Sequence, residues 1–275
     1  MSDSNLPPYV HDLSCLKRSS PSSSPSLSNE EIATHNLQIL TNLKANDSHV
    51  KLGHYVVEGL ENCKVCLESC LKSLSTNCLR LCLKLSAYET LKTQIEDYIK
   101  LYPEFRVILL SSSQLESLTG FPIRRGAIGY GKIPEMRKAT SRGIICLDKI
   151  NDTSNLGGII RTASNLGYDL ALSEDCCSEW YRRSIRTSMG EVFRVNVERV
   201  DLKIFLEEKM RGGWKVLVTS LSEGCVPLTK VDVGDVKFCV VFGNEGEGVR
   251  KEVEDLSDVK VRIESIGEVD SFNVG

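Results

Sequence analysis

Short apolar runs alternate with a helical pattern in the second half of the chain. The runs Gly143–Leu147, Leu170–Leu172, Trp214–Val218 and Phe238–Phe242 have the length and composition of buried strands. Residues Ser154–Leu166, between the first two runs, repeat apolar positions at helical spacing. Strands that alternate with helices predict an α/β fold with a parallel sheet and helices on both faces. Such sheets bind ligands at the carboxyl ends of their strands, so the loops that follow these runs are the candidate site.

The first half of the chain is less regular. It contains strand candidates at His54–Glu58 and Arg106–Leu110, a helical cysteine-rich stretch between them, and a glycine-punctuated segment over residues 120–131. The first 34 residues are rich in serine and proline, a composition that predicts a disordered tail. We therefore expect a tail over residues 1–34, a smaller α/β domain over residues 35–134, a basic linker over residues 135–142 and a main domain over residues 143–275.

The cysteines allow two interpretations. Cys63, Cys66 and Cys70 follow helical spacing, and Cys78 and Cys82 come after them, a set that could hold a metal or line one buried helix face. Leucines and valines interleave with them at the same period, and no paired ligands with histidine accompany them, so we interpret these residues as buried hydrophobic positions and predict no metal site. Eleven cysteines without an apolar leader indicate reduced thiols and a cytoplasmic protein, although the serine-rich start leaves organelle targeting open.

Net charge and hydropathy restrict the partners. The formal charge of -3 does not suit a protein that coats nucleic acid by charge alone, but it allows a local basic patch, for which Arg182, Arg183 and Arg186 are candidates. No apolar run approaches the roughly 20 residues that a membrane helix needs, so we predict no membrane span.

Two loops after predicted strands have unusual compositions. In the first, Asn155 stands at the start of a predicted helix and Arg161 lies six residues further on; Asn155 could simply cap the helix, and Arg161 could be a solvated charge. The second loop reads GNEGEG over Gly243–Gly248, before a helix expected near Val249. It matches neither a dinucleotide fingerprint nor a phosphate-binding loop, and its alternatives are a backbone that approaches a ligand closely or a tight turn.

A third segment, SFNVG at the end of the chain, gains its meaning from the other two. Taken in order, Asn155 to Ala163, Gly243 to Gly248 and Ser271 to Gly275 resemble the motifs of the SpoU branch of the SPOUT methyltransferases. The segment Arg186–Gly190 is similar to the family's Ser-x-Gly stretch. The resemblance covers residues 143–275, and residues 54–59, 107–110 and 120–131 resemble less specifically the ribosomal-protein-like substrate-binding domain of many SpoU enzymes.

The resemblance implies a knotted sheet and transfer of a methyl group from S-adenosylmethionine to a ribose 2′-hydroxyl of tRNA or rRNA. It implies that Arg161 grips an RNA phosphate and orients the hydroxyl, since an arginine is too weak an acid to serve as a free base. The implied catalytic residues are Asn155, Arg161, Glu245, Ser271 and Asn273; the implied cofactor-binding residues are Thr219, Gly243, Ile263 and Phe272; the implied RNA-binding residues are Arg182, Arg183 and Arg186.

Three features depart from the family's pattern. Ile263-Glu264-Ser265 replaces the usual Ile-Pro-Met, Phe272 replaces a leucine, and relatives continue beyond the position of Gly275 through a helix that threads the knot and contributes to a dimer. We expect a homodimer where that helix is present. Two alternatives remain: an RNA-binding relative that lacks catalysis because the helix is absent, and an ordinary nucleotide-binding α/β protein that uses the Gly243–Gly248 loop. The sequence does not identify the RNA or the nucleotide.

Overall fold

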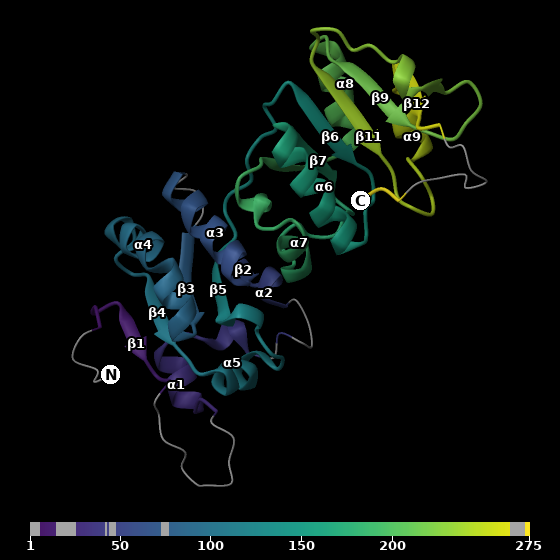
Figure 1. Cartoon of the computed structure of the whole chain (residues 1–275). Helices are drawn as coiled ribbons and strands as arrows, with labels where there is room; N and C mark the ends of the chain where they lie inside the picture. The colour runs from purple at the N-terminus through teal and green to yellow at the C-terminus, as the bar shows by residue number, and fades with distance from the viewer. Residues whose placement is uncertain (1–5, 15–25, 42, 44–47, 73–76, 265–272) are drawn as a thin grey trace. The chain divides into compact units, whose positions relative to one another are not determined.

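The computed structural model describes residues 6–14, 26–41, 43, 48–72, 77–264 and 273–275. The chain divides into two compact units. The N-terminal unit comprises Met1–Glu135 and Trp180–Phe193, and the C-terminal unit comprises Met136–Glu179 and Arg194–Gly275. Each unit is an α/β structure with its own sheet (Figure 1).

A mixed five-stranded sheet forms the N-terminal unit, in the order β1-β4-β3-β5-β2. Its strands are β1 (Val10–Asp12), β2 (His54–Glu58), β3 (Asn77–Leu83), β4 (Arg106–Leu109) and β5 (Ala127–Lys132). Its helices are α1 (Asn29–Thr34), η2 (Gln38–Leu40), α2 (Ser48–Lys51), α3 (Leu60–Lys72), α4 (Leu85–Leu101), α5 (Ser112–Thr119), η3 (Arg124–Gly126), α7 (Arg182–Thr187) and η4 (Glu191–Phe193). β1, β4 and β3 run parallel, whereas β5 is antiparallel to both β3 and β2.

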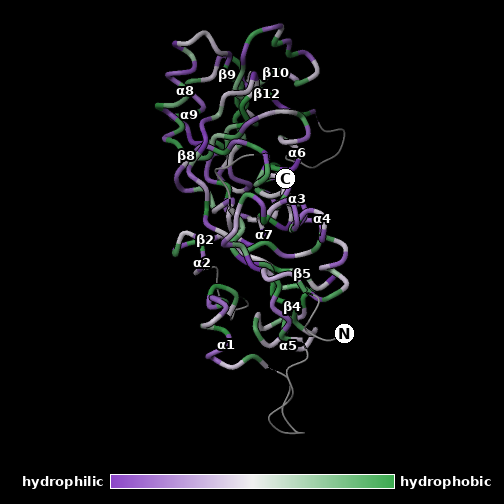
Figure 2. Tube along the Cα trace, turned by 90° about the vertical axis from the view of Figure 1, so that its left-hand side faces the viewer, coloured by the Kyte–Doolittle hydropathy of each residue, from purple (hydrophilic) through white to green (hydrophobic). Residues whose placement is uncertain are grey.

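Apolar side chains cover both faces of this sheet. Val56, Cys82, Ile108 and Ile128 pack with residues of η2 and α5 on one face. Helix α4 carries hydrophobic and hydrophilic residues in turn along the tube (Figure 2), as expected of a helix with one buried side. The cysteines at positions 63, 66, 70, 78 and 82 are all buried, which confirms their interpretation as core residues. Cys78 and Cys82 lie on β3 and not on the helix, because the helical period ends with α3 at Lys72.

Ordered elements occupy part of the stretch that composition assigns to a disordered tail. Val10–Asp12 form β1, which pairs in parallel with β4, and the Val10 side chain is buried. Ser28 caps α1 in a capping box with Glu31. A strand of three residues lies below the length at which a local pattern is visible, and β4 supplies its backbone partners. Residues 10–12 and 29–34 thus have ordered structure within the stretch 1–34.

The segment Trp180–Phe193 belongs to the N-terminal unit, although the sequence places it inside the main domain. The Phe193 ring meets the Tyr55 ring edge to face at 5.0 Å between centroids. Arg182 forms an ion pair of 2.7 Å with Glu58 and lies over the Phe121 ring at 4.3 Å. Aromatic burial and a partly buried ion pair hold this segment on the five-stranded sheet. The main domain is therefore interrupted, and residues 143–275 do not form a single compact unit.

The C-terminal unit contains a seven-stranded, all-parallel sheet in the order β10-β12-β9-β11-β6-β7-β8. Its strands are β6 (Gly143–Leu147), β7 (Asp169–Ser173), β8 (Val197–Val200), β9 (Lys215–Thr219), β10 (Val226–Pro227), β11 (Phe238–Phe242) and β12 (Val259–Arg262). Its helices are α6 (Thr153–Leu166), α8 (Leu202–Arg211), η5 (Leu228–Lys230) and α9 (Lys251–Glu254). The parallel α/β fold predicted from the sequence is confirmed. The knot remains a prediction, since residues 265–272 lie outside the described part.

The direction of the chain places helices on both faces of this sheet. From β6 the chain moves through α6 to β7, and from β8 it moves back through α8 to β9. Because such crossovers are right-handed, these opposite steps put α6 and α8 on opposite faces. Leu202, Phe205 and Leu206 of α8 and Val253 of α9 pack on one face, against Cys146, Val216 and Val241. β6 and β11 thus lie side by side where the order of the strands reverses.

The predicted linker is attached to the C-terminal unit over its second half. The backbone N–H of Ala139 donates to Glu198 at 2.9 Å. The N–H groups of Thr140 and Ser141 both donate to Oδ2 of Asp169, at 2.7 and 2.8 Å. These bonds fix the entry into β6.

Across the described ranges, no helix is long and apolar enough to cross a membrane.

Candidate functional site

The loops that follow β6 and β11 lie next to each other at the strand reversal. β11 pairs with β6 in register over five positions, from Phe238 opposite Gly143 to Phe242 opposite Leu147. Both strands end together, and the N–H of Asp148 donates to the Phe242 carbonyl oxygen at 2.9 Å. In parallel sheets this reversal point is the common ligand site, because the following helices leave toward opposite faces.

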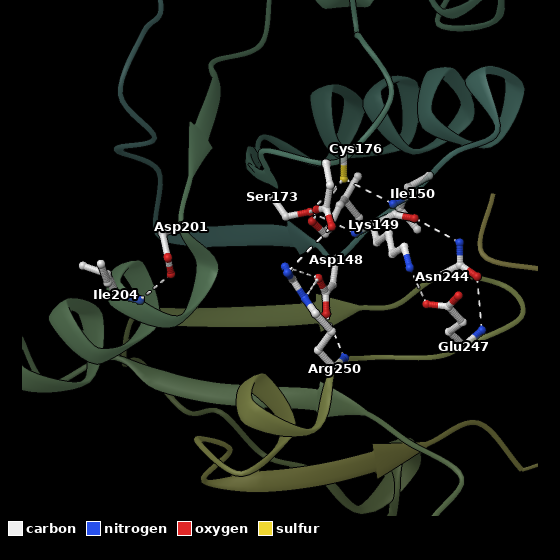
Figure 3. A network of polar contacts seen from close by, with 12 residues as sticks. Asp148, Lys149, Ile150, Ser173, Cys176, Asp201, Ile204, Asn244, Glu247 and Arg250 are labelled. Atoms are coloured by element: carbon white, nitrogen blue, oxygen red, sulfur yellow. Dashed lines mark hydrogen bonds and ion pairs between the residues drawn. The ribbon is translucent and has the colours of Figure 1, made fainter.

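A buried carboxylate joins the two loops (Figure 3). The side chain of Asp148 is fully buried, and its Oδ2 accepts the backbone N–H of Arg250 at 2.8 Å. Its Oδ1 accepts the Nε–H of Arg250 at 2.8 Å and forms an ion pair with Nη2 at 2.6 Å. The hydrogen bond to Asp148 raises the pKa of Arg250. Sequence reasoning missed both residues; the available signal was a carboxylate directly after a buried strand.

The side chain of Asn244 closes the second loop. Its amide donates to the carbonyl oxygen of Lys149 at 3.0 Å, and its Oδ1 accepts the N–H groups of Gly246 and Glu247 at 2.8 and 3.1 Å. Lys149 also forms an ion pair of 2.6 Å with Glu247, which raises the pKa of Lys149. Figure 3 shows the Asn244 side chain reaching the backbone of Lys149, while the Lys149 side chain reaches Glu247. Side-chain contacts within the loop and to Lys149 therefore hold the Gly243–Gly248 loop in its shape.

Gly243 is required by this closure. Asn244 and Gly248 exchange two backbone hydrogen bonds, of 2.9 and 3.1 Å. A Cβ atom at position 243 would lie 2.2 Å from the carbonyl carbon of Gly248 and 2.2 Å from the nitrogen of Val249. Of the two interpretations of this glycine, the structure supports the tight turn, since the returning chain occupies the space of a side chain.

Asp152, and not Asn155, caps α6. Oδ1 of Asp152 accepts the N–H groups of Ser154 and Asn155 at 2.6 and 2.9 Å, as expected of an N-cap aspartate. The side chain of Asn155 is therefore available for other contacts. Its amide donates to Oε1 of Glu245 and, at 3.3 Å, to Oδ1 of Asn273, and its Oδ1 accepts from the Asn273 amide at 3.1 Å. Three predicted catalytic residues, from three separate motifs, thus form one polar cluster.

The chain end runs along α6 from this cluster toward Arg161. A Cβ atom on Gly275 would lie 2.7 Å from Oδ1 of Asn155, and one on Gly158 would lie 3.9 Å from the Gly275 carbonyl carbon. Gly158 and Arg161 are three residues apart, so they share a helix face. The Arg161 side chain is exposed and forms no ion pair within the described ranges. An exposed cation that forms no ion pair with a described residue therefore lies beyond the cluster on the same helix.

The predicted cofactor residues are only partly described. Thr219 ends β9, and its hydroxyl donates to the Val241 carbonyl oxygen at 3.0 Å, so it fastens β9 to β11. Ile263 directly follows β12 and is 55% exposed. Ser271 and Phe272 lie outside the described residues.

The three arginines of the predicted RNA patch differ in their exposure. Arg182 is partly buried and contacts Glu58 and Phe121, as described above. Arg183 and Arg186 are exposed. A phosphate contact by Arg182 would first have to break its ion pair.

Among the residues with described positions, no group of histidine, cysteine or acidic side chains could hold a metal ion.

Comparisons with known proteins agree with these features. Residues 142–275 match the SpoU rRNA Methylase family. The 23S rRNA (guanosine(2553)-2′-O)-methyltransferase of Bacillus subtilis is 30% identical over 167 residues, which cover 60% of this chain and 66% of that protein. An uncharacterized tRNA/rRNA methyltransferase of Mycobacterium tuberculosis is 31% identical over 173 residues, which cover 60% of each chain. The match thus spans between 60% and 66% of the length of these relatives.

Solved structures share the fold. The AdoMet-bound rRNA methyltransferase from Sinorhizobium meliloti has a TM-score of 0.73 and 19% identity, with 97% of this chain and 93% of that chain covered. The SpoU methyltransferase AviRb from Streptomyces viridochromogenes has a TM-score of 0.67 and 18% identity, with 88% and 91% covered. At these identities the likeness establishes the fold alone.

Proposed function

Because this chain belongs to the SpoU methylase family, we propose that it transfers a methyl group from S-adenosylmethionine to a ribose 2′-hydroxyl of rRNA or tRNA. The observation that carries this proposal is the cluster of Asn155, Glu245 and Asn273 at the ends of β6 and β11. The relatives whose names state an activity are RNA methyltransferases, and one of them is named for 2′-O-methylation of 23S rRNA.

Positioning is the main task in this reaction. A ribose hydroxyl is a poor nucleophile near neutral pH, so it must be held in line with the methyl group while its proton is shared. The 2′-oxygen forms a bond to the methyl carbon, the carbon–sulfur bond breaks, and its electron pair stays on sulfur. The guanidinium cation of Arg161 can bind the neighbouring phosphate through two N–H groups. The hydroxyl proton then passes to that phosphate or to water.

The cluster of Asn155, Glu245 and Asn273 holds the ribose in position for this reaction. Glu245 accepts from the Asn155 amide, which fixes the orientation of Asn155 beside Asn273. Asp148 and Arg250 hold the two loops together beneath the cluster. These residues orient the ribose and its phosphate, and Arg161 supplies the charge.

The residues near the strand ends suit S-adenosylmethionine, which supplies an electrophilic methyl group when bound. The exposed Ile263 offers an apolar surface for an adenine ring, at the end of a strand next to β9. Thr219 keeps the ends of β9 and β11 aligned through its bond to Val241. We propose that Ile263 contacts the adenine and that the Gly243–Gly248 loop borders the rest of the cofactor.

Substitution of Arg161 tests the proposal. We expect Arg161→Ala to lower methyl transfer into bulk rRNA or tRNA by about 100-fold or more, because a lost positioning contact costs rates of this order. Its unfolding midpoint and its affinity for S-adenosylhomocysteine should stay unchanged, since an exposed charge contributes little stability. Arg211→Ala, at the exposed end of α8, is the matched control and should retain full activity. Equal rates for both variants would reject the role of Arg161.

Two finer points belong to the same proposal. Calorimetry with S-adenosylhomocysteine separates an enzyme from a relative that only binds RNA, because only the enzyme needs the cofactor. The homodimer stays a prediction, which a mass measurement of the whole chain in solution tests.

A further inference from the structure

Four basic side chains gather at one end of the five-stranded sheet, and we call them the His/Arg cluster: His11, His35, Arg80 and Arg106. His11 lies on β1 and His35 follows α1, and their ring centroids are 4.9 Å apart. Arg80 and Arg106 are register partners on the neighbouring strands β3 and β4, so both side chains leave the same face of the sheet. Nε of Arg80 donates to the carbonyl oxygen of His35 at 3.3 Å, which links the two pairs.

Neither guanidinium of this cluster has an acidic partner in the described part of the chain. Arg80 donates to three backbone carbonyl oxygens, those of His35, Leu79 and Glu104. Arg106 donates through Nη1 to those of Pro103 and Phe105. The Nη2 atoms of both residues have no hydrogen-bond partner among the described residues, and both side chains are partly exposed. Each guanidinium thus keeps Nη2 for a charge-assisted hydrogen bond to an anion such as phosphate.

Burial and nearby positive charges lower the pKa of both histidines. Burial lowers the pKa of His11, and the charges of Arg106 and Arg80 lower it further. Burial, His11 and Arg80 lower the pKa of His35, while Glu31 acts in the opposite direction. The Glu31 carboxylate is already engaged with Ser28 in the cap of α1. The positive charge of the cluster therefore rests on Arg80 and Arg106, and Glu31, the described carboxylate that acts on His35, is engaged with Ser28.

We propose that the His/Arg cluster is a binding site for a phosphate group, with Arg80 and Arg106 as its charged donors and the two imidazoles as its rim. If the chain acts on RNA as proposed above, the phosphodiester backbone of the RNA supplies this group to the N-terminal unit. The site differs from the Asn155 cluster, since it lies on the other sheet and contains none of the predicted catalytic residues.

The first test uses inorganic phosphate and the whole chain. We expect phosphate to shift the imidazole proton signals of His11 and His35 in a saturable way. Arg106→Gln should lose most of this response, and Arg106→Lys should keep part of it because the charge remains. The control is Lys92→Gln, an exposed charge on α4 in the same unit, and it should respond like the parent. Unchanged histidine shifts on addition of phosphate, or an equal response in the Arg106→Gln variant, would overturn the site.

The second test uses a single-stranded RNA oligonucleotide. We expect Arg106→Gln to weaken RNA binding and to reduce the slope of log affinity against log salt by about 1, as the loss of one phosphate contact requires. Lys92→Gln should leave that slope unchanged. A phosphate response without an effect on RNA would keep the anion site and reject RNA as its source. Methyl transfer is measured separately, so its absence in the parent chain would reject the proposed activity and leave this site standing.

Discussion

Asp148 and Arg250 connect the loops after the two central strands of the parallel sheet through a fully buried carboxylate that accepts two N–H groups of Arg250 and forms an ion pair with its Nη2. One of these donors is the backbone N–H of Arg250, so the interaction fixes the backbone after the GNEGEG loop as well as the side chain. A charge so deeply buried is tolerated only when its hydrogen bonds are satisfied.

We predict that Arg250→Gln lowers the free energy of unfolding of the C-terminal unit by about 1 to 3 kcal/mol, the usual result of leaving a buried acceptor short of its donors. The loss stays below that of a wholly buried pair because Arg250 is partly exposed and the backbone donor remains. Urea unfolding measures it. Lys251→Gln removes a charge from the next residue, an exposed lysine whose closer partner is the exposed Asp255 at 2.8 Å, and should change stability by less than about 0.5 kcal/mol. Similar losses in both variants would contradict the role of the buried pair.

Asp152 and Asn155 are predicted to have opposite effects. Asp152→Ala should cost about 1 kcal/mol of stability, because it removes the cap of α6. Asn155→Ala should leave stability nearly unchanged and lower methyl transfer at least 10-fold, because it removes the link between Glu245 and Asn273. Unfolding curves and initial rates on both variants check this pair. The reverse pattern would assign the cap to Asn155.

Two glycines of one loop allow a controlled test of loop closure. Gly243→Ala should lower stability by about 1 to 3 kcal/mol and weaken S-adenosylhomocysteine binding, because its Cβ would collide with the backbone at Gly248. Gly246→Ala should be tolerated, since its Cβ would meet only Oδ1 of Asn244 at an ordinary 3.5 Å. Calorimetry on both variants measures the affinity. Full affinity in Gly243→Ala would show that closure of this loop is dispensable.

Two arginines of α7 are expected to have different roles, Arg186 in RNA binding and Arg182 in stability. Arg186→Gln is expected to weaken RNA binding and to reduce its salt dependence by about one phosphate contact, without loss of stability. Arg182→Gln should instead lower stability, because it leaves the largely buried carboxylate of Glu58 unpaired. RNA titrations at several salt concentrations and unfolding curves distinguish the two. An equal loss of RNA binding without any loss of stability would return Arg182 to the RNA patch.

The histidines predict a pH dependence in the N-terminal unit. Both have pKa values below the ordinary 6.5, so the unfolded chain takes up protons that the folded chain refuses. Stability is therefore highest above that pH and falls as the pH drops through about 6.5. We expect His11 and His35 to titrate below 6.5 in NMR spectra, and stability to decline between pH 7 and 5.5. His11→Gln/His35→Gln should lessen this decline, and titration at or above 6.5 would contradict it.

Elements with local signals are predictable from the amino-acid sequence. The strands His54–Glu58, Gly143–Leu147 and Phe238–Phe242 were predicted to the residue, because a buried strand between turn residues is a continuous apolar run. The burial of the cysteines followed from their spacing among leucines. The motif resemblance also singled out Asn155, Glu245 and Asn273 before any geometry was available.

Only the tertiary structure decided what depends on partners distant in the chain. β1 exists because β4 offers it hydrogen bonds, and the segment Trp180–Phe193 belongs to the N-terminal unit because Tyr55 and Glu58 receive it. The partners of Asn155 lie 90 and 118 residues away, and those of Asp148 lie 102 residues away. Local periodicity records which residues are buried, but not which surfaces meet. Pairing between distant segments depends on how the whole chain packs, and it is this packing that assembles the site.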